Sequence, residues 1–243
     1  RWGDGVRTSI PGLALVFIAL LAVYFVLMKV VPVPGYGAGL LGSPDGNLAG
    51  YIDRVVFGPH VWEAAKTWDP EGLLSTLPAI ATTLSGILAA WWIRTGRSHV
   101  RIFVGMVTTG VVMVGIAYLI DPVFPINKQI WSPSYVFLSS GLAAVVLALI
   151  YAYTDWAGKR FGSKPFLIFG SNAIAAYVLS SFFGQVLYLI PVGDTSLKGY
   201  LYANAFQPVF GNELGSLMFA LAFVLVWLGV LSILYARKIF IKV

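Results

Sequence analysis

Long apolar stretches recur along the chain, and a polar or mixed segment separates each from the next. A helix needs about 20 residues to cross roughly 30 Å of hydrocarbon, which offers the backbone no other hydrogen-bond partner. Six stretches reach this length, at residues 13–31, 73–93, 102–120, 135–153, 166–190 and 214–235. The pattern predicts an all-α polytopic membrane protein with about six transmembrane helices, which form a single helical domain over residues 1–243.

The composition supports a lipid environment and excludes some kinds of chemistry. Hydrophobic residues make up 58% of the chain and charged residues only 11%, far from the balance of a soluble domain. Eight Trp and twelve Tyr residues suit the membrane interface, because their rings are apolar at one end and polar at the other. The absence of cysteine excludes disulfides and thiolate metal sites.

The distribution of Lys and Arg predicts the orientation of the helices. Eleven cations lie at the chain ends or at alternate connections, namely Arg1, Arg7, Arg94, Arg97, Arg101, Lys159, Arg160, Lys164, Arg237, Lys238 and Lys242. The other five are Lys29, Arg54, Lys66, Lys128 and Lys198. The positive-inside rule places the first set, and so both termini, in the cytoplasm. We therefore expect a multi-pass protein of the inner (cytoplasmic) membrane, whose net charge of +6 reflects topology and not a nucleic-acid partner.

Residues 32–72 form a long connection that this orientation places on the external side. A loop of this length is usually either functional or disordered. Residues 51–57 are mostly aromatic and aliphatic, which argues against disorder and predicts a short amphipathic helix lying on the bundle. We expect the functional surface to face outward.

Two carboxylates, Asp69 and Glu71, come just before the second apolar stretch. One interpretation is purely structural, with Asp69 as N-cap, Pro70 at the first helical position and Glu71 in the first turn. The other is functional, because carboxylates at the external mouth of a bundle accept hydrogen bonds from sugar hydroxyls or an amine. Both interpretations stay open at the level of sequence.

A second external cluster lies at residues 125–135 and leads into the fourth stretch. It contains Asn127, Lys128 and Trp131, residue types that are common both in polar or carbohydrate pockets and at membrane interfaces. We favour a functional role, because Lys128 is one of few external cations and lies beside aromatic residues.

Other kinds of chemistry find little support in the sequence. The chain has two histidines, His60 and His99, which cannot form a multi-histidine metal site and do not indicate a Ser-His-Asp arrangement. The six stretches contain almost no ionisable residues, which argues against an ion-coupled pump. Gly37, Gly39 and Gly42 match a dinucleotide-binding spacing without the strand and helix that such a motif requires, so they indicate a flexible turn.

Four runs of the chain carry a resemblance to a known family. They are LAGYIDR at 48–54, WDPEGLLST at 68–76, PINKQIWSPSYV at 125–136 and RKIFIK at 237–242. In order and spacing they resemble the C-terminal half of the heparan-α-glucosaminide N-acetyltransferase family, in particular its small bacterial members.

The resemblance implies a transmembrane acyltransferase that transfers acetyl from cytoplasmic acetyl-CoA to a glucosamine-type amine on the external side, without a metal. It implies that seven external residues line or support the substrate site: Asp53, Arg54, Asp69, Glu71, Asn127, Lys128 and Trp131. A carboxylate would orient the amine, while Lys128 or Asn127 would bind a carbonyl oxygen or a phosphate.

The catalytic histidine that the resemblance implies lies in the half of the family that precedes Arg1. We therefore expect this chain to be part of a longer one and to be unable to catalyse alone. Two other functions stay open: a transporter of amino sugars or peptidoglycan fragments, and a non-catalytic structural subunit of a membrane complex. The expected partners are membrane lipid, an amino sugar or glycan acceptor, and either a second copy or other subunits.

Overall fold

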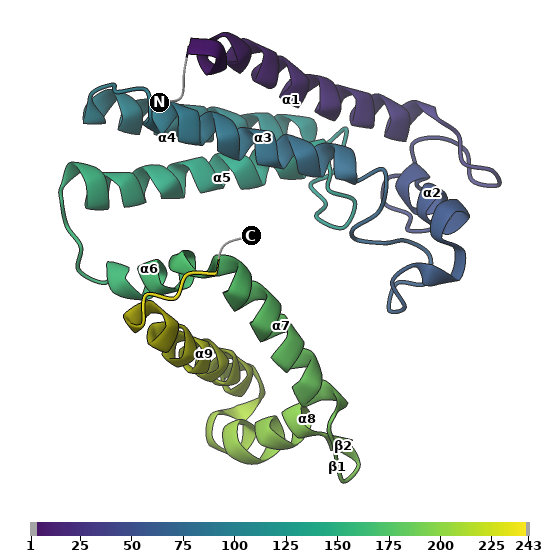
Figure 1. Cartoon of the computed structure of the whole chain (residues 1–243). Coiled ribbons are helices and arrows are strands. Elements are labelled where there is room, and N and C mark those ends of the chain that lie inside the picture. Colours follow the sequence, from purple (N-terminus) through teal and green to yellow (C-terminus); the bar gives the residue numbers. More distant parts are fainter. Residues whose placement is uncertain (1–3, 242–243) are drawn as a thin grey trace. The chain divides into compact units, whose positions relative to one another are not determined.

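The computed structural model describes residues 4–241, with side chains described for residues 10–241. The chain divides into two compact units, Arg1–Lys159 and Arg160–Val243, and each is described here by itself. Nearly all the regular structure is helical (Figure 1). The predicted all-α class is therefore confirmed.

The first unit contains four long helices and the elements that connect them. The elements are α1 (Asp4–Val30), α2 (Leu48–Phe57), the 3₁₀ turn η1 (Gly58–His60), α3 (Thr76–Ile93), α4 (His99–Ile120), α5 (Pro133–Tyr151) and the π-helical segment η2 (Ala152–Trp156). Helix α1 packs mainly against α3, α4 packs mainly against α5, and α3 also contacts α5. The short helix expected near residues 51–57 is present as α2, and one side of it is buried.

Helices α4 and α5 approach each other closely because both carry glycine at their crossing. A Cβ atom at Gly110 would lie 2.7 Å from the carbonyl oxygen of Gly141, and a Cβ atom at Gly141 would lie 2.7 Å from that of Gly110. At the other end of the pair, the Tyr151 hydroxyl lies 2.7 Å from Nδ1 of His99. Small residues of this kind allow helices in lipid to pack through their backbones.

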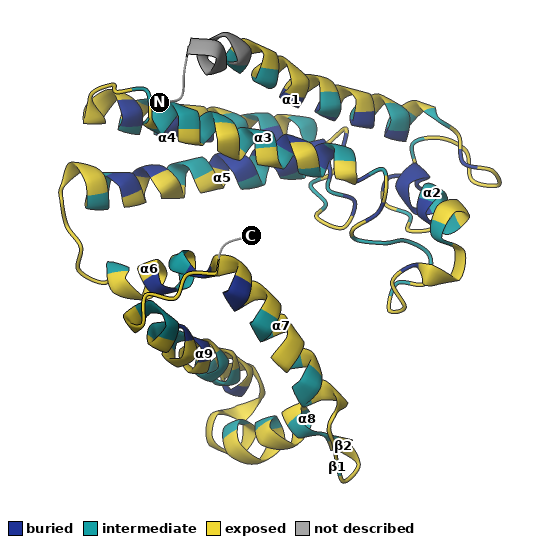
Figure 2. Cartoon of the chain, in the orientation of Figure 1, coloured by how far each residue is buried: buried dark blue, intermediate teal, exposed yellow. Residues whose placement is uncertain are grey.

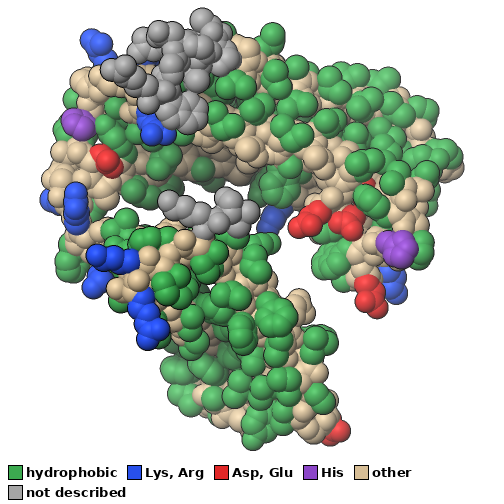
Figure 3. Space-filling view, viewed as in Figure 1, with side chains coloured by type: hydrophobic (Ala, Val, Ile, Leu, Met, Phe, Trp, Pro, Cys, Tyr) green, Lys and Arg blue, Asp and Glu red, His purple; other side chains and the backbone are tan. Residues whose placement is uncertain are grey.

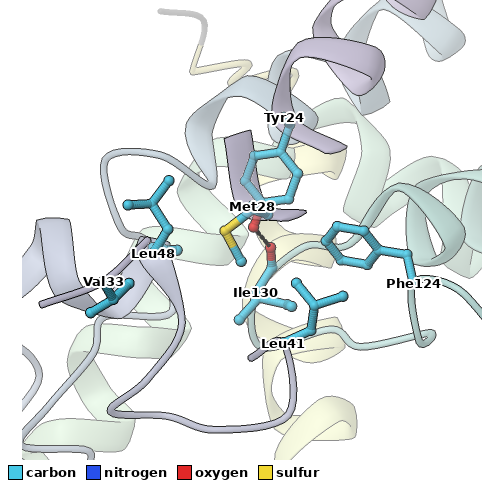
Figure 4. Close-up of a cluster of buried hydrophobic side chains, with 8 residues drawn as sticks. Tyr24, Met28, Val33, Leu41, Leu48, Phe124 and Ile130 are labelled. Carbon is cyan, nitrogen blue, oxygen red and sulfur yellow. Dashed lines mark hydrogen bonds between the residues drawn. The ribbon is translucent and has the colours of Figure 1, made fainter. Parts of the chain in front are cut away.

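A cluster of buried side chains joins the loops at one end of the first unit to α1 (Figure 4). The hydroxyl of Tyr24, on α1, donates a hydrogen bond of 2.5 Å to the carbonyl oxygen of Ile130. Leu48 from α2, Val33 and Phe124 pack into the same cluster. The two external segments that the sequence singled out therefore share one hydrophobic support.

The second unit is built around a broken helix and one long helix. It contains α6 (Ser163–Ser171), α7 (Ala173–Leu189), the two-stranded hairpin β1 (Pro191–Val192) and β2 (Thr195–Ser196), α8 (Leu197–Leu201), the π-helical segment η3 (Tyr202–Phe206) and α9 (Gln207–Ala236). Gly211, with φ of 74°, interrupts α9 near its start. The fully buried Asn172 lies between α6 and α7, donates to the carbonyl oxygen of Ile239 and accepts from the amide of Ile241.

Five helical segments of the described chain are long and apolar enough to cross a membrane, and a sixth is obtained if α6 and α7 are counted as one span. Much of their surface is exposed apolar side chain (Figure 2), as expected for helices that face lipid. The structure differs from the sequence prediction at 166–190, where one continuous helix was expected. The chain bends there by 83° between α6 and α7. The cytoplasmic location of the termini stays a prediction.

Candidate functional site

Asp53 is a buried carboxylate that organises the loop before α3. Only 1% of its surface is exposed, and its two carboxylate oxygens accept hydrogen bonds from the backbone amides of Asp69 at 3.2 Å and Leu73 at 3.0 Å. Gly72 lies so close to this carboxylate that a Cβ atom there would collide with it. Asp53 therefore supports the shape of the 69–73 segment from within.

The environment of Asp53 raises the pKa of its side chain. Burial disfavours the charged form and is the largest cause, while the two backbone hydrogen bonds act in the opposite direction. The neighbouring Asp69 adds a smaller repulsion and Arg54 a smaller attraction. The carboxylate is thus a structural group whose proton affinity is coupled to the fold of the loop.

Arg54, the residue that follows Asp53 in α2, has a similar supporting role. Its guanidinium group donates to the carbonyl oxygen of Thr67 at 2.7 Å and to that of Asp45 at 2.6 Å. These two contacts connect the segments of the loop that precede and follow α2. Asn47 caps the N-terminus of α2, and its side chain accepts from the amide of Gly50.

Asp69 does not cap the second long helix, so the structural interpretation of the Asp69–Glu71 pair is wrong. Helix α3 begins only at Thr76. Asp69 instead accepts from the backbone amides of Trp62 at 3.0 Å and Glu71 at 2.9 Å, and its carbonyl oxygen accepts from Gly72 at 3.1 Å. The reason is local: Asp69 starts a tight turn of its own, stabilised by Asp53 beneath it, and this turn leaves Glu71 exposed.

The 125–135 segment is also a compact hydrogen-bonded loop. The amide of Asn127 donates to Oγ of Ser132 at 2.9 Å, and Oδ1 of Asn127 accepts from the amide of Gln129 at 2.8 Å. Ser134 donates to the carbonyl oxygen of Phe124 at 2.7 Å. Lys128 is exposed at the turn between these contacts. Of the seven expected site residues, only Glu71 and Lys128 are exposed.

Trp131 points from this loop into the helices of the first unit. It adopts a positive φ of 50°, and its indole Nε1 donates to Oγ1 of Thr82 on α3 at 3.0 Å. Its ring also contacts Tyr135 edge to face, with ring centroids 5.3 Å apart. Of the seven expected site residues, Trp131 is therefore the one that connects the loop to the interior of the unit.

That interior contains a cavity of about 700 Å³ between α3, α4 and α5. Trp131 and Tyr135 lie on its wall near the starts of α3 and α5, and Trp91 and Trp92 lie on its wall at the end of α3. The rest of the wall is mostly apolar, with hydroxyl groups from Thr82, Ser85, Thr109, Ser139 and Ser140. Ser85 donates to Ser140 at 2.9 Å across the helices. Thr82 and Trp92 are ten residues apart, so the cavity extends about 15 Å along α3.

The sequence analysis did not identify these hydroxyl residues. A signal existed, because small and hydroxyl residues recur at helical spacing in the second and fourth apolar stretches, as at Thr82, Ser85 and Ala89. In lipid this pattern is common at ordinary helix contacts, which is why it does not by itself indicate a cavity. The carboxylates Asp53, Asp69 and Glu71 do not line the cavity.

Within residues 4–241, no group of three or more potential metal-binding side chains occurs. His60 lies exposed in η1 on the external loop. Acidic side chains gather at the end of the first unit that carries α2 (Figure 3), so this surface is suited to hydroxyl or amine groups of a ligand.

Comparison with known proteins gives this arrangement a context. The chain is 29% identical to human heparan-alpha-glucosaminide N-acetyltransferase over 192 residues, which cover 68% of this chain and 29% of the human protein. The mouse protein of the same name is 27% identical over the same length and shares of the two chains. Over about two thirds of its length the chain is thus similar to heparan-alpha-glucosaminide N-acetyltransferases.

The chain spans about 29% of the length of these relatives of the family. No family model matches it. The expected resemblance to heparan-alpha-glucosaminide N-acetyltransferases is thus confirmed, while the bacterial origin stays a prediction.

Proposed function

We propose that this chain forms part of a membrane acetyltransferase, which transfers acetyl from acetyl-CoA to the amine of a glucosamine-type sugar on the external side. The proposal rests mainly on the similarity of the chain to the human and mouse heparan-alpha-glucosaminide N-acetyltransferases. It is supported by the exposed carboxylate of Glu71 on a turn that buried side chains keep in shape, next to a membrane unit that contains a cavity.

In the proposed reaction the amine nitrogen attacks the thioester carbonyl carbon. The new C–N bond forms as the C–S bond breaks, coenzyme A leaves as the thiolate, and the amine loses a proton to a base. Glu71 would accept hydrogen bonds from the amine or a neighbouring hydroxyl and so orient the acceptor. Lys128 would stabilise the oxyanion that develops on the carbonyl. Neither Glu71 nor Lys128 is proposed to be this base, and neither is His60.

The cavity supports this proposal, because a donor made in the cytoplasm must bring its acetyl group to an acceptor on the other side. A flexible acyl-carrying arm with amide groups fits a narrow apolar space with scattered hydroxyls. In the proposed orientation Trp91 and Trp92 are at the cytoplasmic end of the cavity and Trp131 is at the external end. Acetyl-CoA would thus enter beside the basic turn at residues 94–101.

A transporter is the second candidate, and one observation favours it. The bend of 83° between α6 and α7 produces two half-helices, an arrangement that many transporters use at their substrate sites. The fully buried Asn172 at this bend already bonds the backbone of residues 239–241, so its polar groups are occupied by the chain itself. The side chain of Asn172 therefore does not offer a free binding group for a transported sugar, and the transporter stays the second candidate.

Acetyl transfer by the full natural gene product distinguishes the two functions. Labelled acetyl-CoA and glucosamine are supplied to the purified protein in detergent, and N-acetylated product is measured. The acetyltransferase proposal expects product that depends on both substrates. Sugar uptake into proteoliposomes without acetyl-CoA, together with no acetylated product, would favour the transporter instead.

A further inference from the structure

The turn between α3 and α4 places the guanidinium group of Arg97 over the ring of Trp92. The guanidinium carbon of Arg97 lies 3.8 Å from the ring centroid of Trp92 and 5.8 Å from that of Trp91. A stacked guanidinium is attracted to the ring face and keeps its N–H donors around its edge, in the plane parallel to the ring. Arg97 is therefore oriented to bind an anion at its edge.

Trp92 is fixed in its own position by two contacts with α4. Its indole Nε1 donates to the carbonyl oxygen of Ile102 at 3.2 Å. Its ring lies against Gly105, where an added Cβ atom would collide with the ring. The platform under Arg97 is therefore rigid, and the glycine is what allows the ring to approach α4 so closely.

A groove of about 460 Å³ begins at this platform and is separate from the larger cavity described above. Its walls are Trp92, Arg97, Val100, Arg101, Val104 and Gly105. Arg97 and Arg101 are four residues apart, and both are exposed. Val100 and Val104, one helical turn apart on α4, are 53% and 51% exposed. The groove thus combines two cations with an adjoining apolar strip.

We propose that this groove binds one anionic phospholipid, with its phosphate against Arg97 and Arg101 and an acyl chain along Val100 and Val104. Charge complementarity favours this occupant, because guanidinium groups bind phosphate oxygens in a bidentate manner. The apolar strip and the indole match the lower headgroup region, where tryptophan is enriched. Positive side chains beside a span attract anionic lipids of the cytoplasmic leaflet. A soluble phosphate compound would make no use of the exposed valines.

This lipid site goes beyond the acetyltransferase function and does not depend on it. The groove and the larger cavity share Trp92 and Gly105. A bound lipid would consequently lie against the end of the cavity where the donor is proposed to enter, and would stabilise the Trp92 platform there.

Lipid binding to the full natural protein tests the proposal. The detergent-purified, delipidated protein is titrated with phosphatidylglycerol or phosphatidylcholine, and bound lipids are counted by native mass spectrometry. We expect one phosphatidylglycerol molecule to bind more tightly than the rest. The Arg97→Gln/Arg101→Gln double variant should weaken it by about tenfold or more, since it removes charge-assisted hydrogen bonds.

A matched variant removes two charges from another basic turn, Lys159→Gln/Arg160→Gln, and should leave this binding within about twofold, as expected for distant sites. Val104→Asn should weaken phosphatidylglycerol binding as well, because it interrupts the apolar strip. Equal losses in both double variants, or equal binding of the two lipids, would overturn the proposal by showing only general attraction. Displacement of the lipid by inorganic phosphate, with no effect of Val104→Asn, would identify a soluble phosphate site and overturn the lipid assignment.

Discussion

The carboxylate of Asp53 on α2 accepts a hydrogen bond from the backbone amide of Asp69, sixteen residues further along the chain. The same carboxylate accepts from the amide of Leu73, so one buried side chain connects α2 to both ends of the turn that carries Glu71. The position of Glu71, whose exposed carboxylate is proposed to bind the acceptor sugar, thus depends on the buried carboxylate of Asp53.

Asp53→Ala should destabilise the protein by about 1–3 kcal/mol, because it leaves two partly buried backbone amides without their acceptor. Thermal unfolding in detergent measures the change. It can be monitored by circular dichroism or by a fluorescence assay that does not require a cysteine. Asp45→Ala is the matched control, since it removes an exposed carboxylate from the same loop and should change stability by less than about 0.5 kcal/mol. An equal loss in both variants would contradict the supporting role of Asp53.

The raised pKa of Asp53 predicts a dependence of stability on pH. Because the folded protein binds this proton more tightly than the unfolded chain, protonation favours the folded state. The Asp53 contribution to stability should therefore increase as pH falls through its raised pKa towards the ordinary value of 3.8. Comparison with Asp53→Asn, which cannot titrate, isolates this term from those of other carboxylates. A stability difference between the two proteins that is constant with pH, or that changes in the opposite direction, would be inconsistent with it.

The crossing of α4 and α5 should tolerate no side chain at either glycine. Gly110→Ala or Gly141→Ala places a Cβ atom 2.7 Å from a backbone carbonyl oxygen, and overpacking of this kind costs about 1–3 kcal/mol. Gly115→Ala lies on the same helix α4 with open space around it, so it should be neutral or slightly stabilising. Melting temperatures of the three variants in detergent test the crossing. A Gly110→Ala protein as stable as Gly115→Ala would argue against the close approach.

Trp131 and Thr82 should act as a pair in positioning the external end of the cavity. Trp131→Phe and Thr82→Val each remove the hydrogen bond between the indole and the hydroxyl. We expect each variant to lower acetyl transfer, and the double variant to be no worse than the more affected single one, since the same contact is lost. Additive losses in a double-mutant cycle of kcat/KM would show that the two residues act separately.

The sequence predicted the fold class well, because helices in lipid must be long and apolar, and this requirement is visible in any window of about 20 residues. It did not predict the break at Asn172, which follows Gly170 and Ser171 inside the fifth stretch. What breaks the helix there is a long-range contact, since Asn172 bonds the backbone at Ile239 and Ile241. A local pattern carries no information on a partner 67 residues away.

The candidate site shows the same division between local and distant information. Motifs at 48–54, 68–76 and 125–136 identified the two external loops that share the Tyr24 and Ile130 cluster. The sequence did not distinguish the buried Asp53 from the exposed Glu71, because burial depends on which loop lies over which. Of its two interpretations of Asp69, the helix N-cap was wrong, since Asp and Pro start helices and tight turns equally well.

Sided acetyl transfer tests the central claim most directly. Sealed inside-out vesicles that contain the full gene product enclose a glucosamine acceptor, and labelled acetyl-CoA is added outside, at the face that was cytoplasmic. We predict label on the enclosed sugar, reduced about tenfold or more by Glu71→Gln and nearly unchanged by Glu63→Gln, an exposed carboxylate of the same loop. No enclosed acetylated product from the unmodified protein, or equal activity of Glu71→Gln and the unmodified protein, would contradict the account.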